Sequence, residues 1–221
     1  MSLSIKLSGI ADRLRDTAAF GLRFSKGVYE QERFRAVQDA AIELFSLATA
    51  TPIEDFEPIR KKVLSRPTPF VAGDAAIIDE EGQMLLIRRT DNQKWAMPGG
   101  ALEVGETPAA GIEREALEET GVRCRATDLV GIHDSRLCQT QSPNHLYHIM
   151  YLCQATNATN FGKGSHSHEV LDVRWFAQSD LESLDLDPGH RSRIPEAYRV
   201  WRGDKAAYFD RTEVLNGPAA G

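Results

Sequence analysis

The sequence predicts an α/β or α+β domain preceded by a small helical domain. Up to about residue 50, apolar residues recur every three or four positions, which is the spacing of one face of a helix. From residue 70 onward, short segments rich in apolar and β-branched residues are separated by turns, and two helical segments lie among them. Strands and helices mixed in this way favour an α/β or α+β fold.

The N-terminal segment is expected to form a helical hairpin. One apolar stripe consists of Leu3, Leu7, Ile10 and Leu14, and a second of Phe34, Val37, Ala41, Leu44, Phe45 and Ala48. A break falls at residues 25–27, Ser-Lys-Gly, and a short third helix is expected over residues 56–64. Helices this short bury little surface alone, so residues 1–65 are expected to pack on the rest of the chain, as a substrate lid, or on a second copy, as a dimer interface.

The main domain is expected to alternate strands and helices. We expect strands at residues 71–78, 84–88, 122–132, 146–154 and 170–176, and helices at residues 108–120 and 192–201. Residues 155–167, rich in Thr, Asn, Gly, Ser and His, are expected to form a mobile loop. The predicted organisation is therefore a helical extension over residues 1–65, a main domain over residues 66–210 and a flexible tail over residues 211–221.

Charge and cysteine content restrict the partners and the compartment. The net charge of −6 gives no electrostatic footprint for long duplex nucleic acid or for an anionic membrane. Cys124, Cys138 and Cys153 form no CxxC pair and lie in apolar surroundings, which indicates reduced, buried thiols. No apolar run approaches 18 residues, and the first residues lack the features of a secretory signal. We therefore expect a cytoplasmic protein without a membrane partner.

The clearest chemical signal lies on the helix expected at residues 108–120. Glu115, Glu118 and Glu119 are spaced i, i+3 and i+4, so their carboxylates share one arc of about 100°. Like charges on one face repel each other, and a bound cation relieves that repulsion. Carboxylate oxygens suit Mg²⁺ or Mn²⁺, and Arg114 is placed four residues before Glu118 to orient it. The alternative interpretation is a solvated acidic face without a ligand.

The ends of this helix are marked in the sequence as well. Thr107 can act as the N-cap, and Pro108 occupies the first helical position, where proline is favoured. Gly121 can adopt the left-handed conformation that follows a last helical turn. The helix is therefore expected to begin and end at defined residues.

A longer motif surrounds the three glutamates. From Gly100 to Gly121 the spacing is G-x5-E-x7-R-E-x-x-E-E-x-G, which would arise by chance in about one sequence in a million. At these residues the chain resembles the Nudix hydrolases, with the small Ala116 in the hydrophobic slot of the Nudix box. Residues 95–99 and 173–176 also resemble the segments that flank the box in that family. The resemblance implies a Nudix-type α/β/α sandwich with a mixed sheet.

A second, less specific resemblance lies in the helical extension. Residues 22–34, Leu-Arg-Phe-Ser-Lys-Gly-Val-Tyr-Glu-Gln-Glu-Arg-Phe, are similar to the N-terminal extension of Nudix enzymes of the CDP-choline pyrophosphatase type. Those enzymes act on nucleoside diphosphates linked to another group, here called X. Together the two resemblances cover nearly the whole chain.

The Nudix resemblance implies a metal-dependent hydrolase that directs water at the phosphorus of a diphosphate. By the matching positions, it implies that Glu115, Glu118 and Glu119 are ligands of one to three Mg²⁺ or Mn²⁺ ions, together with the backbone carbonyl of Gly100. It also implies that Arg114 positions this cluster of carboxylates.

The general base in this family is either a glutamate of the box or an acid on a later loop. Glu169, which follows a Gly/Ser/His loop, is the candidate here for the base or an extra metal ligand, and Glu118 of the box is the base if Glu169 has no role. The alternative for Glu169 is an ordinary surface glutamate at the start of a strand.

Five further positions are candidates for contact with the substrate. They are Arg88, Gly99, Gly100, Tyr147 and His148. The glycines allow the backbone to approach closely, and the others supply charged or polar groups in or near strands. A single strand histidine is more often a hydrogen-bonded structural residue, which is the alternative for His148.

The leading functional interpretation is Mg²⁺-dependent hydrolysis of the diphosphate bond in a nucleoside diphosphate linked to X. With CDP-choline or ADP-ribose as models, the products would be a nucleoside monophosphate and phospho-X. An alternative enzyme would act on RNA 5′ ends or on nucleoside triphosphates. A module that senses ADP-ribose without cleaving it is the alternative of another class, and the complete carboxylate triad argues against it. The expected partners are a small nucleoside diphosphate derivative and a second copy of the chain in a homodimer.

Overall fold

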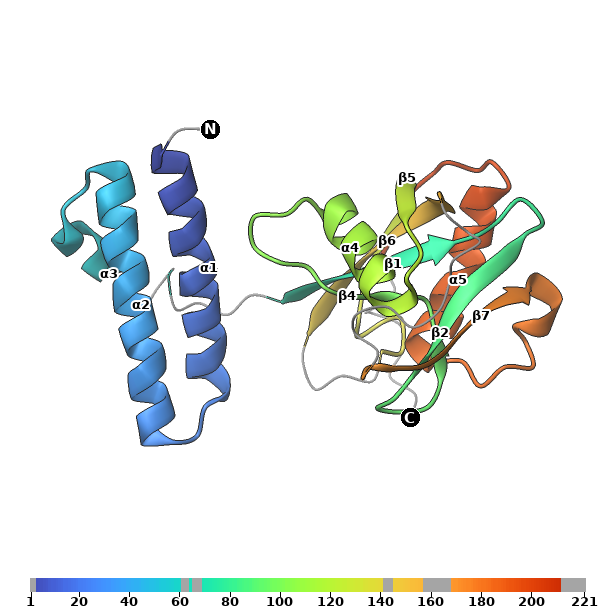
Figure 1. Cartoon of the computed structure of the whole chain (residues 1–221), viewed down its shortest axis with the longest axis horizontal. Helices are drawn as coiled ribbons and strands as arrows, with labels where there is room; N and C mark the ends of the chain where they lie inside the picture. The colour runs from blue at the N-terminus through green and yellow to red at the C-terminus, as the bar shows by residue number, and fades with distance from the viewer. Residues whose placement is uncertain (1–2, 61–63, 65–68, 141–144, 157–167, 212–221) are drawn as a thin grey trace. The chain divides into compact units, whose positions relative to one another are not determined.

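The computed structural model describes residues 3–60, 64, 69–140, 145–156 and 168–211 (Figure 1). The chain divides into two compact units, one built from residues 1–68 and 103–105 and the other from residues 69–102 and 106–221. The loop expected at residues 155–167, apart from its first two residues, lies outside the described residues. The same holds for residues 61–63 of the third expected helix and for all of the expected tail except residue 211.

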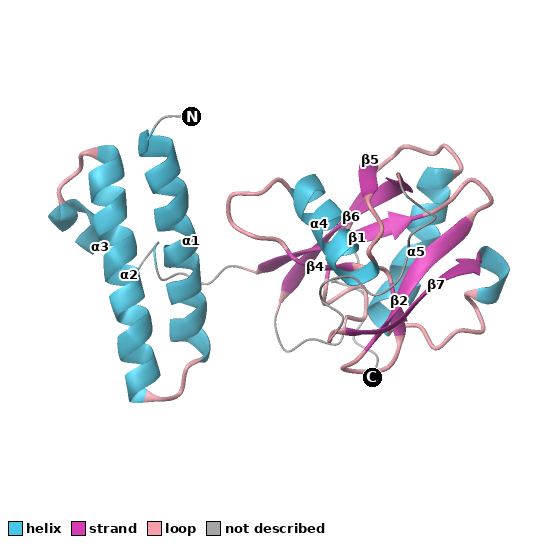
Figure 2. Ribbon diagram, viewed as in Figure 1, coloured by secondary structure: helices cyan, strands magenta, loops and turns pink. Residues whose placement is uncertain are grey.

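The first unit is a helical hairpin, as predicted. Helix α1 (Leu3–Phe24) and helix α2 (Val28–Thr49) pack side by side and are joined at the Ser-Lys-Gly break (Figure 2). Small side chains bring the helices close, because Ala11, Ala18 and Ala41 are almost completely buried. Ser4 Oγ donates a hydrogen bond of 2.6 Å to the Ala48 carbonyl and ties the start of α1 to the end of α2.

The third helical segment is described only in part. It consists of a 3₁₀ turn, η1 (Ile53–Phe56), followed by α3 (Glu57–Ile59). Arg60 ties this segment to α2 through an ion pair with Asp39 at 2.5 Å, and within the segment it pairs with Glu57 at 2.7 Å.

Two glycines of α1 are expected to respond oppositely to alanine. A Cβ on exposed Gly9 meets no atom within 4 Å, so Gly9→Ala should raise the free energy of unfolding by about 0.5–1 kcal/mol through helix propensity. A Cβ on buried Gly21 would lie 2.2 Å from the Phe34 ring, so Gly21→Ala should lower the free energy of unfolding by about 1–3 kcal/mol. Circular dichroism at 222 nm during heating of the full chain measures both changes. Shifts of the same sign would contradict this packing.

The second unit is a mixed α/β structure, which confirms the predicted fold class. In the described part of the chain its strands are β1 (Phe70–Ile77), β2 (Gln83–Arg89), β3 (Trp95–Ala96), β4 (Gly99–Ala101), β5 (Cys124–Asp134), β6 (Leu146–Ala155), β7 (Val170–Ala177) and β8 (Tyr208–Phe209). One sheet has the order β4-β1-β6-β5-β8 and the other β3-β2-β7. The larger sheet is mixed, because β1 pairs in parallel with β6 and antiparallel with β4.

Two helices enclose these strands. Helix α4 (Pro108–Thr120) packs on one side and helix α5 (Pro188–Trp201) on the other (Figure 2). Because successive side chains of a strand point to opposite faces, these strands contribute to two separate hydrophobic cores. On the α4 side, Ala75, Ile77, Leu85 and Ile87 pack with Ile112 and Ala116. On the α5 side, Ala76, Ile78, Met84 and Leu86 pack with Ile194, Ala197 and Tyr198.

Helix α5 begins four residues before the predicted start. Asp187 is its N-cap, with Oδ1 accepting a 3.0 Å hydrogen bond from the Gly189 amide, and Pro188 occupies the first helical position. Asp-Pro is a recognisable helix start, so this boundary was available in the sequence. The short strands β3, β4 and β8 were not predicted, since two or three residues show no periodicity.

Strand β8 covers the outer edge of β5. It pairs in parallel with Gly131 and Ile132, and the Tyr208 ring stacks on the His133 ring at 4.6 Å. A Cβ on Gly131 would lie 2.7 Å from Tyr208, so the glycine lets this segment cross closely. Asp210 Oδ2 accepts a 2.5 Å hydrogen bond from the Asp134 amide and fastens the end of β8.

Candidate active site

Helix α4 has the ends that its sequence predicts. Thr107 Oγ1 accepts a 3.2 Å hydrogen bond from the Ala110 amide, and Gly121 adopts the left-handed conformation with a 2.9 Å bond to the Leu117 carbonyl. The apolar stripe of the helix, with Ile112 and Ala116 fully buried, seats it against the sheet.

Arg114 gathers the carboxylates of the motif. Its Nη1 donates to Glu115 Oε1 at 2.9 Å and to Glu118 Oε2 at 3.0 Å, and its Nη2 donates to Glu106 Oε1 at 3.0 Å. The hydrogen bond to Glu106 and those to the other two carboxylates raise the pKa of Arg114 above its usual value. The predicted contact with Glu118 is therefore present, and Glu106, a fixed residue of the motif to which we assigned no role, completes the cluster.

Glu119 occupies the most enclosed position of the three glutamates. It is 6% exposed, and its Oε2 accepts a 2.8 Å hydrogen bond from the Gly99 amide. Burial raises the pKa of Glu119 to about 8, and the negative charges of Glu115 and Glu169 act in the same direction. The site thus holds a carboxyl group whose ionisation needs additional positive charge.

Gly99 and Gly100 bring backbone into this cluster. In β4 they pair with Asp74 and Gly73 of β1. A Cβ on Gly99 would lie 2.1 Å from the Gly73 carbonyl oxygen, and one on Gly100 would lie 2.7 Å from Glu115 Oε2. The absence of side chains therefore allows the β4 backbone to reach the α4 carboxylates, as the resemblance implies.

The residues fit a divalent cation by donor chemistry. Glu115, Glu118, Glu119 and the Gly100 carbonyl offer hard oxygen donors, the kind that Mg²⁺ and Mn²⁺ prefer. Within the described ranges, no group of three or more His, Cys, Asp or Glu side chains is already drawn together as a metal site. Arg114 contacts Glu115 and Glu118, so these two carboxylates already have a cationic partner.

Glu169 lies within electrostatic range of the cluster. Its carbonyl accepts hydrogen bonds from the Thr90 amide at 3.0 Å and from Thr90 Oγ1 at 3.1 Å, which ties the start of β7 to the end of β2. Its carboxylate is exposed and lies 3.2 Å from His168 Nε2. The structure thus fixes its backbone and leaves its side chain at the surface.

The two arginines at the end of β2 differ in their surroundings. Arg88, the predicted candidate, is exposed and donates a 2.9 Å hydrogen bond from Nε to the Gln93 carbonyl. Arg89 pairs with Asp91 at 2.6 Å, and its charge acts on both Glu119 and Asp187. Arg89, which the sequence analysis missed, is therefore electrostatically linked to the acidic cluster. Two consecutive arginines carry no sequence signal that distinguishes their faces.

Tyr147 and His148 are not brought together. Successive residues of a strand face opposite sides, and the ring of Tyr147, a residue that is 39% exposed, meets the His145 ring edge-on at 5.0 Å. His148 is buried, with Nε2 3.1 Å from Thr140 Oγ1 and Nδ1 3.3 Å from Asp74 Oδ2. His148 thus belongs to an internal polar network.

That network contains residues that the sequence analysis missed. Asp74 pairs with Arg193, which is 1% exposed, and lies 3.7 Å from His190 Nδ1. Burial opposes ionisation of Asp74, but the Arg193 charge prevails and holds the pKa of Asp74 below its usual value. Burial and the same charge lower the pKa of His190 to about 3, so His190 is neutral. The available signal was an aspartate within an otherwise apolar strand.

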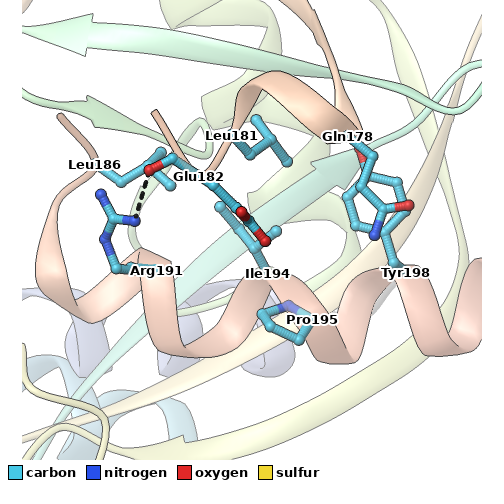
Figure 3. Close-up of a pocket in the computed structure, with 8 residues that line it drawn as sticks. All are labelled: Gln178, Leu181, Glu182, Leu186, Arg191, Ile194, Pro195 and Tyr198. Carbon is cyan, nitrogen blue, oxygen red and sulfur yellow. Dashed lines mark hydrogen bonds between the residues drawn. The ribbon is translucent and has the colours of Figure 1, made fainter. Parts of the chain in front are cut away.

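A separate pocket of about 250 Å³ lies beside α5 (Figure 3). It is lined by Gln178, Leu181, Glu182, Leu186, Arg191, Ile194, Pro195 and Tyr198. Arg191 closes one side by donating a 2.6 Å hydrogen bond from Nη2 to the Leu184 carbonyl. The pocket lining includes none of the predicted site residues.

Comparison with known proteins identifies the family. A model described as the NUDIX domain matches residues 68–197. The chain belongs to the Nudix family. A second model, described as a UDP-X-like N-terminal oligomerisation domain, matches residues 6–59 of this Nudix protein and confirms the resemblance of its helical extension. The predicted enzyme class is confirmed as well, because this Nudix protein is a hydrolase of pyrophosphate bonds.

Three relatives illustrate the similarity. A Bacillus subtilis (strain 168) protein, provisionally named ADP-ribose pyrophosphatase YjhB, is 29% identical over 202 residues, which cover 90% of this Nudix protein and 95% of that relative. The MutT-like protein of Streptomyces ambofaciens is 41% identical over 140 residues, which cover 63% of this Nudix protein and 79% of that relative. The crystal structure of a UDP-X diphosphatase shares the fold, with a TM-score of 0.58 and 23% identity. The match covers 94% of this Nudix protein and 99% of that chain.

The described residues also bear on the membrane expectation. None of the helices in those ranges is both long enough and apolar enough to cross a membrane.

Proposed function

We propose that this Nudix protein uses Mg²⁺ or Mn²⁺ to hydrolyse the diphosphate bond of a nucleoside diphosphate linked to X. ADP-ribose, UDP-linked and CDP-linked compounds are the candidate substrates, and the products are a nucleoside monophosphate and phospho-X. The observation that carries the proposal is buried Glu119, bound to the Gly99 amide and placed on the helical face of Glu115 and Glu118. The names of the ADP-ribose pyrophosphatase and UDP-X diphosphatase relatives support the substrate class.

The chain's own residues divide the work of this reaction. Glu115, Glu118, Glu119 and the Gly100 carbonyl would hold the cation, which when bound would neutralise diphosphate charge and lower the pKa of a bound water. Arg114 keeps the Glu115 and Glu118 carboxylates oriented through its 2.9 Å and 3.0 Å hydrogen bonds.

Two surface groups complete the proposed machinery. Glu169 accepts the proton of the attacking water, and its tethered backbone keeps it beside the acidic cluster. Arg89 binds a phosphate oxygen, because its charge acts on Glu119 and the side chain therefore lies near the acidic cluster.

A substrate panel tests this function. The purified chain is incubated with Mg²⁺ and ADP-ribose, a UDP-sugar, CDP-choline, a deoxynucleoside triphosphate or 5′-triphosphate RNA, and products are separated by chromatography. We expect a nucleoside monophosphate and phospho-X from at least one X-linked compound. Release of pyrophosphate from the triphosphate or the RNA alone would favour the alternative enzyme. Tight binding of ADP-ribose with no product from any compound would favour the sensing module.

Glu169→Gln is expected to lower kcat about a hundredfold at neutral pH, near the lower end of what a positioned base contributes. Much of the loss should return as rising pH supplies hydroxide, because the substitution removes a proton acceptor and keeps the shape. The pH–rate profiles of both proteins at saturating Mg²⁺ measure this recovery.

A control and a metal titration separate the two proposed roles of Glu169. Asp172→Asn, three residues further along and within β7, keeps its hydrogen bond to the Val173 amide and should leave kcat unchanged. If Glu169→Gln instead raises the Mg²⁺ concentration needed for half-maximal rate, Glu169 is a ligand. If Glu169→Gln changes neither the pH–rate profile nor the Mg²⁺ dependence of the rate, the base is assigned to Glu118.

The helical extension is proposed to form a homodimer. It exposes apolar side chains along both helices, namely Leu3, Ile5, Phe20, Val28, Tyr29 and Leu47, each at least half exposed. Burying such a surface between two copies would be favourable, and the matching oligomerisation model supports this assembly. The role of residues 1–65 as a lid over the site is the competing proposal.

Sedimentation at micromolar concentration is expected to give about twice the chain mass of 24.5 kDa. Leu47→Glu should shift the protein toward the monomer, because it buries a charge in the apolar interface, and its helix content should not change. Arg35→Glu, at an exposed polar position of α2, is the matched control and should remain dimeric. A wild-type monomer at this concentration would rule out the dimer.

A further inference from the structure

The segment from Trp95 to Gly100 is held between α4 and α5 by side-chain acceptors. On the α4 side, Glu119 Oε2 accepts from the Gly99 amide at 2.8 Å. On the α5 side, His190 Nδ1 accepts from the Met97 amide at 3.3 Å, within the buried interior. Pro98 lies between them and has no amide hydrogen, so these two bonds satisfy both amides on either side of it.

His190 continues a backbone ladder that ends where α5 begins. The Trp95 amide donates to the Asp185 carbonyl at 2.9 Å, and the Asp187 amide donates to the Trp95 carbonyl at 2.8 Å. After Asp187 the chain turns into α5, where backbone carbonyls point along the helix axis. The imidazole of His190 therefore supplies the next acceptor, for Met97, that a continuing strand would have supplied.

Buried charged side chains lie around His190. Asp74 Oδ1 lies 3.7 Å from its Nδ1, and Arg193, one turn further along α5, pairs with Asp74. Arg193 Nε also donates a 2.8 Å hydrogen bond to the Gly189 carbonyl, next to His190. Asp74 itself pairs in register with Gly99 across β1 and β4. The network thus touches the glycine segment from the sheet and from the helix.

We propose that His190 is a positioning residue for the Gly99–Gly100 backbone, acting through the hydrogen bond that its Nδ1 accepts from the Met97 amide. The inference rests on the proposed function, because it concerns the carbonyl that would bind the cation. Its chemistry is that of a permanently neutral imidazole whose Nδ1 accepts one main-chain hydrogen bond. Loss of that acceptor leaves the buried Met97 amide unpaired and frees the segment to shift away from Glu119.

The tautomer of His190 tests the proposal without any substitution. Because Met97 donates to Nδ1, the ring proton must reside on Nε2. The ¹⁵N shifts of histidine-labelled protein should show an unprotonated Nδ1 and a protonated Nε2 for His190, unchanged between pH 6 and pH 8. The signal is assigned by its absence from His190→Asn. A proton on Nδ1 anywhere in this range would overturn the proposal.

Two substitutions separate the acceptor from the volume of the ring. His190→Leu fills the space without an acceptor, and His190→Asn places an amide oxygen near the position of Nδ1. Calorimetric titration of the substrate-free chain with Mn²⁺ should show ten- to a hundredfold weaker binding for the leucine variant, the usual cost of losing an outer-shell partner. The asparagine variant should recover most of the affinity. Hydrogen exchange at Gly99 should accelerate only in the leucine variant.

Matched controls distinguish positioning from general destabilisation. Tyr198→Phe removes another buried hydrogen bond of α5, 3.0 Å to the Gly82 carbonyl, about 12 Å along the helix from His190. It should lower the melting temperature without changing Mn²⁺ affinity. If His190→Leu folds and binds Mn²⁺ as wild type does, the proposal fails. If Glu119→Gln also leaves Mn²⁺ binding unchanged, the proposed function fails with it.

Discussion

Glu119→Gln is expected to lower kcat by a factor of about 10² to 10⁴ while making the metal-free protein more stable. The kinetic loss follows because a metal ligand contributes several kilocalories per mole to the transition state, and each 1.36 kcal/mol is tenfold in rate. Glutamine can still accept the hydrogen bond from the Gly99 amide, so the geometry of β4 should persist. Steady-state kinetics at saturating Mg²⁺ measure the loss.

The stability gain has a definite pH dependence. Burial and nearby carboxylates raise the pKa of Glu119 to about 8 from an ordinary value of 4.5. The protonated form is favoured in the folded state, so the stability that this group contributes is complete below pH 4.5 and is lost as pH rises through 8. In chelator, the difference in melting temperature between variant and wild type should therefore grow from pH 5 to pH 8.5. Mg²⁺ should raise the melting temperature of the wild type only.

Glu113→Gln is the matched control on the same helix. Glu113 Oε1 accepts a 2.9 Å hydrogen bond from the Ala126 amide, which glutamine can also accept. The control should therefore keep wild-type kcat and show no change in the response to Mg²⁺. Equal kinetic losses at Glu113 and Glu119 would show that the helix tolerates no charge change, and wild-type turnover in Glu119→Gln would exclude it as a ligand.

Gly99→Ala is expected to lower kcat/KM about a thousandfold and the free energy of unfolding by about 1–3 kcal/mol. Its Cβ would lie 2.1 Å from the Gly73 carbonyl oxygen, and the nearest atoms all belong to the main chain of Gly73 and Asp74, so no flexible side chain can yield. Displacement of β4 by about 1 Å would misplace the Gly100 carbonyl, at a cost of roughly a hundredfold. Weakening of the bond between the Gly99 amide and Glu119 accounts for about a further tenfold.

Initial rates at low substrate and thermal unfolding together check this expectation. Ala101→Ser, at the exposed end of the same short strand, is the control and should change neither quantity measurably. Wild-type values of kcat/KM and melting temperature in Gly99→Ala would show that β4 does not need to approach β1 so closely.

Helix α4 could be predicted to the residue because its signals are local. Thr107, Pro108 and Gly121 mark its ends, and the intervals among Glu115, Glu118 and Glu119 place them on one face without knowledge of the rest of the fold. The family resemblance draws on the same stretch. The acidic half of the candidate site was therefore accessible from sequence alone.

The buried polar network and the glycine strand beside the acidic residues depend on contacts between distant segments. Asp74 and Arg193 pair across 119 positions of sequence, and no periodicity links an aspartate on a strand with an arginine on a helix. His190 acts through a ring nitrogen on an amide 93 positions away. Strands β3 and β4 form because of such partners, so they could not be identified from their two or three residues.

Strand β8 has a consequence for how the molecule behaves among its copies. An uncovered β5 edge would present a row of free amides and carbonyls, the usual starting point for strand exchange and aggregation. Residues 208–210 occupy part of that row with main-chain pairing to Gly131 and Ile132 and with the Asp210 carboxylate on the Asp134 amide. The sheet is therefore protected from intermolecular pairing along this stretch of β5, and self-association is left to other surfaces.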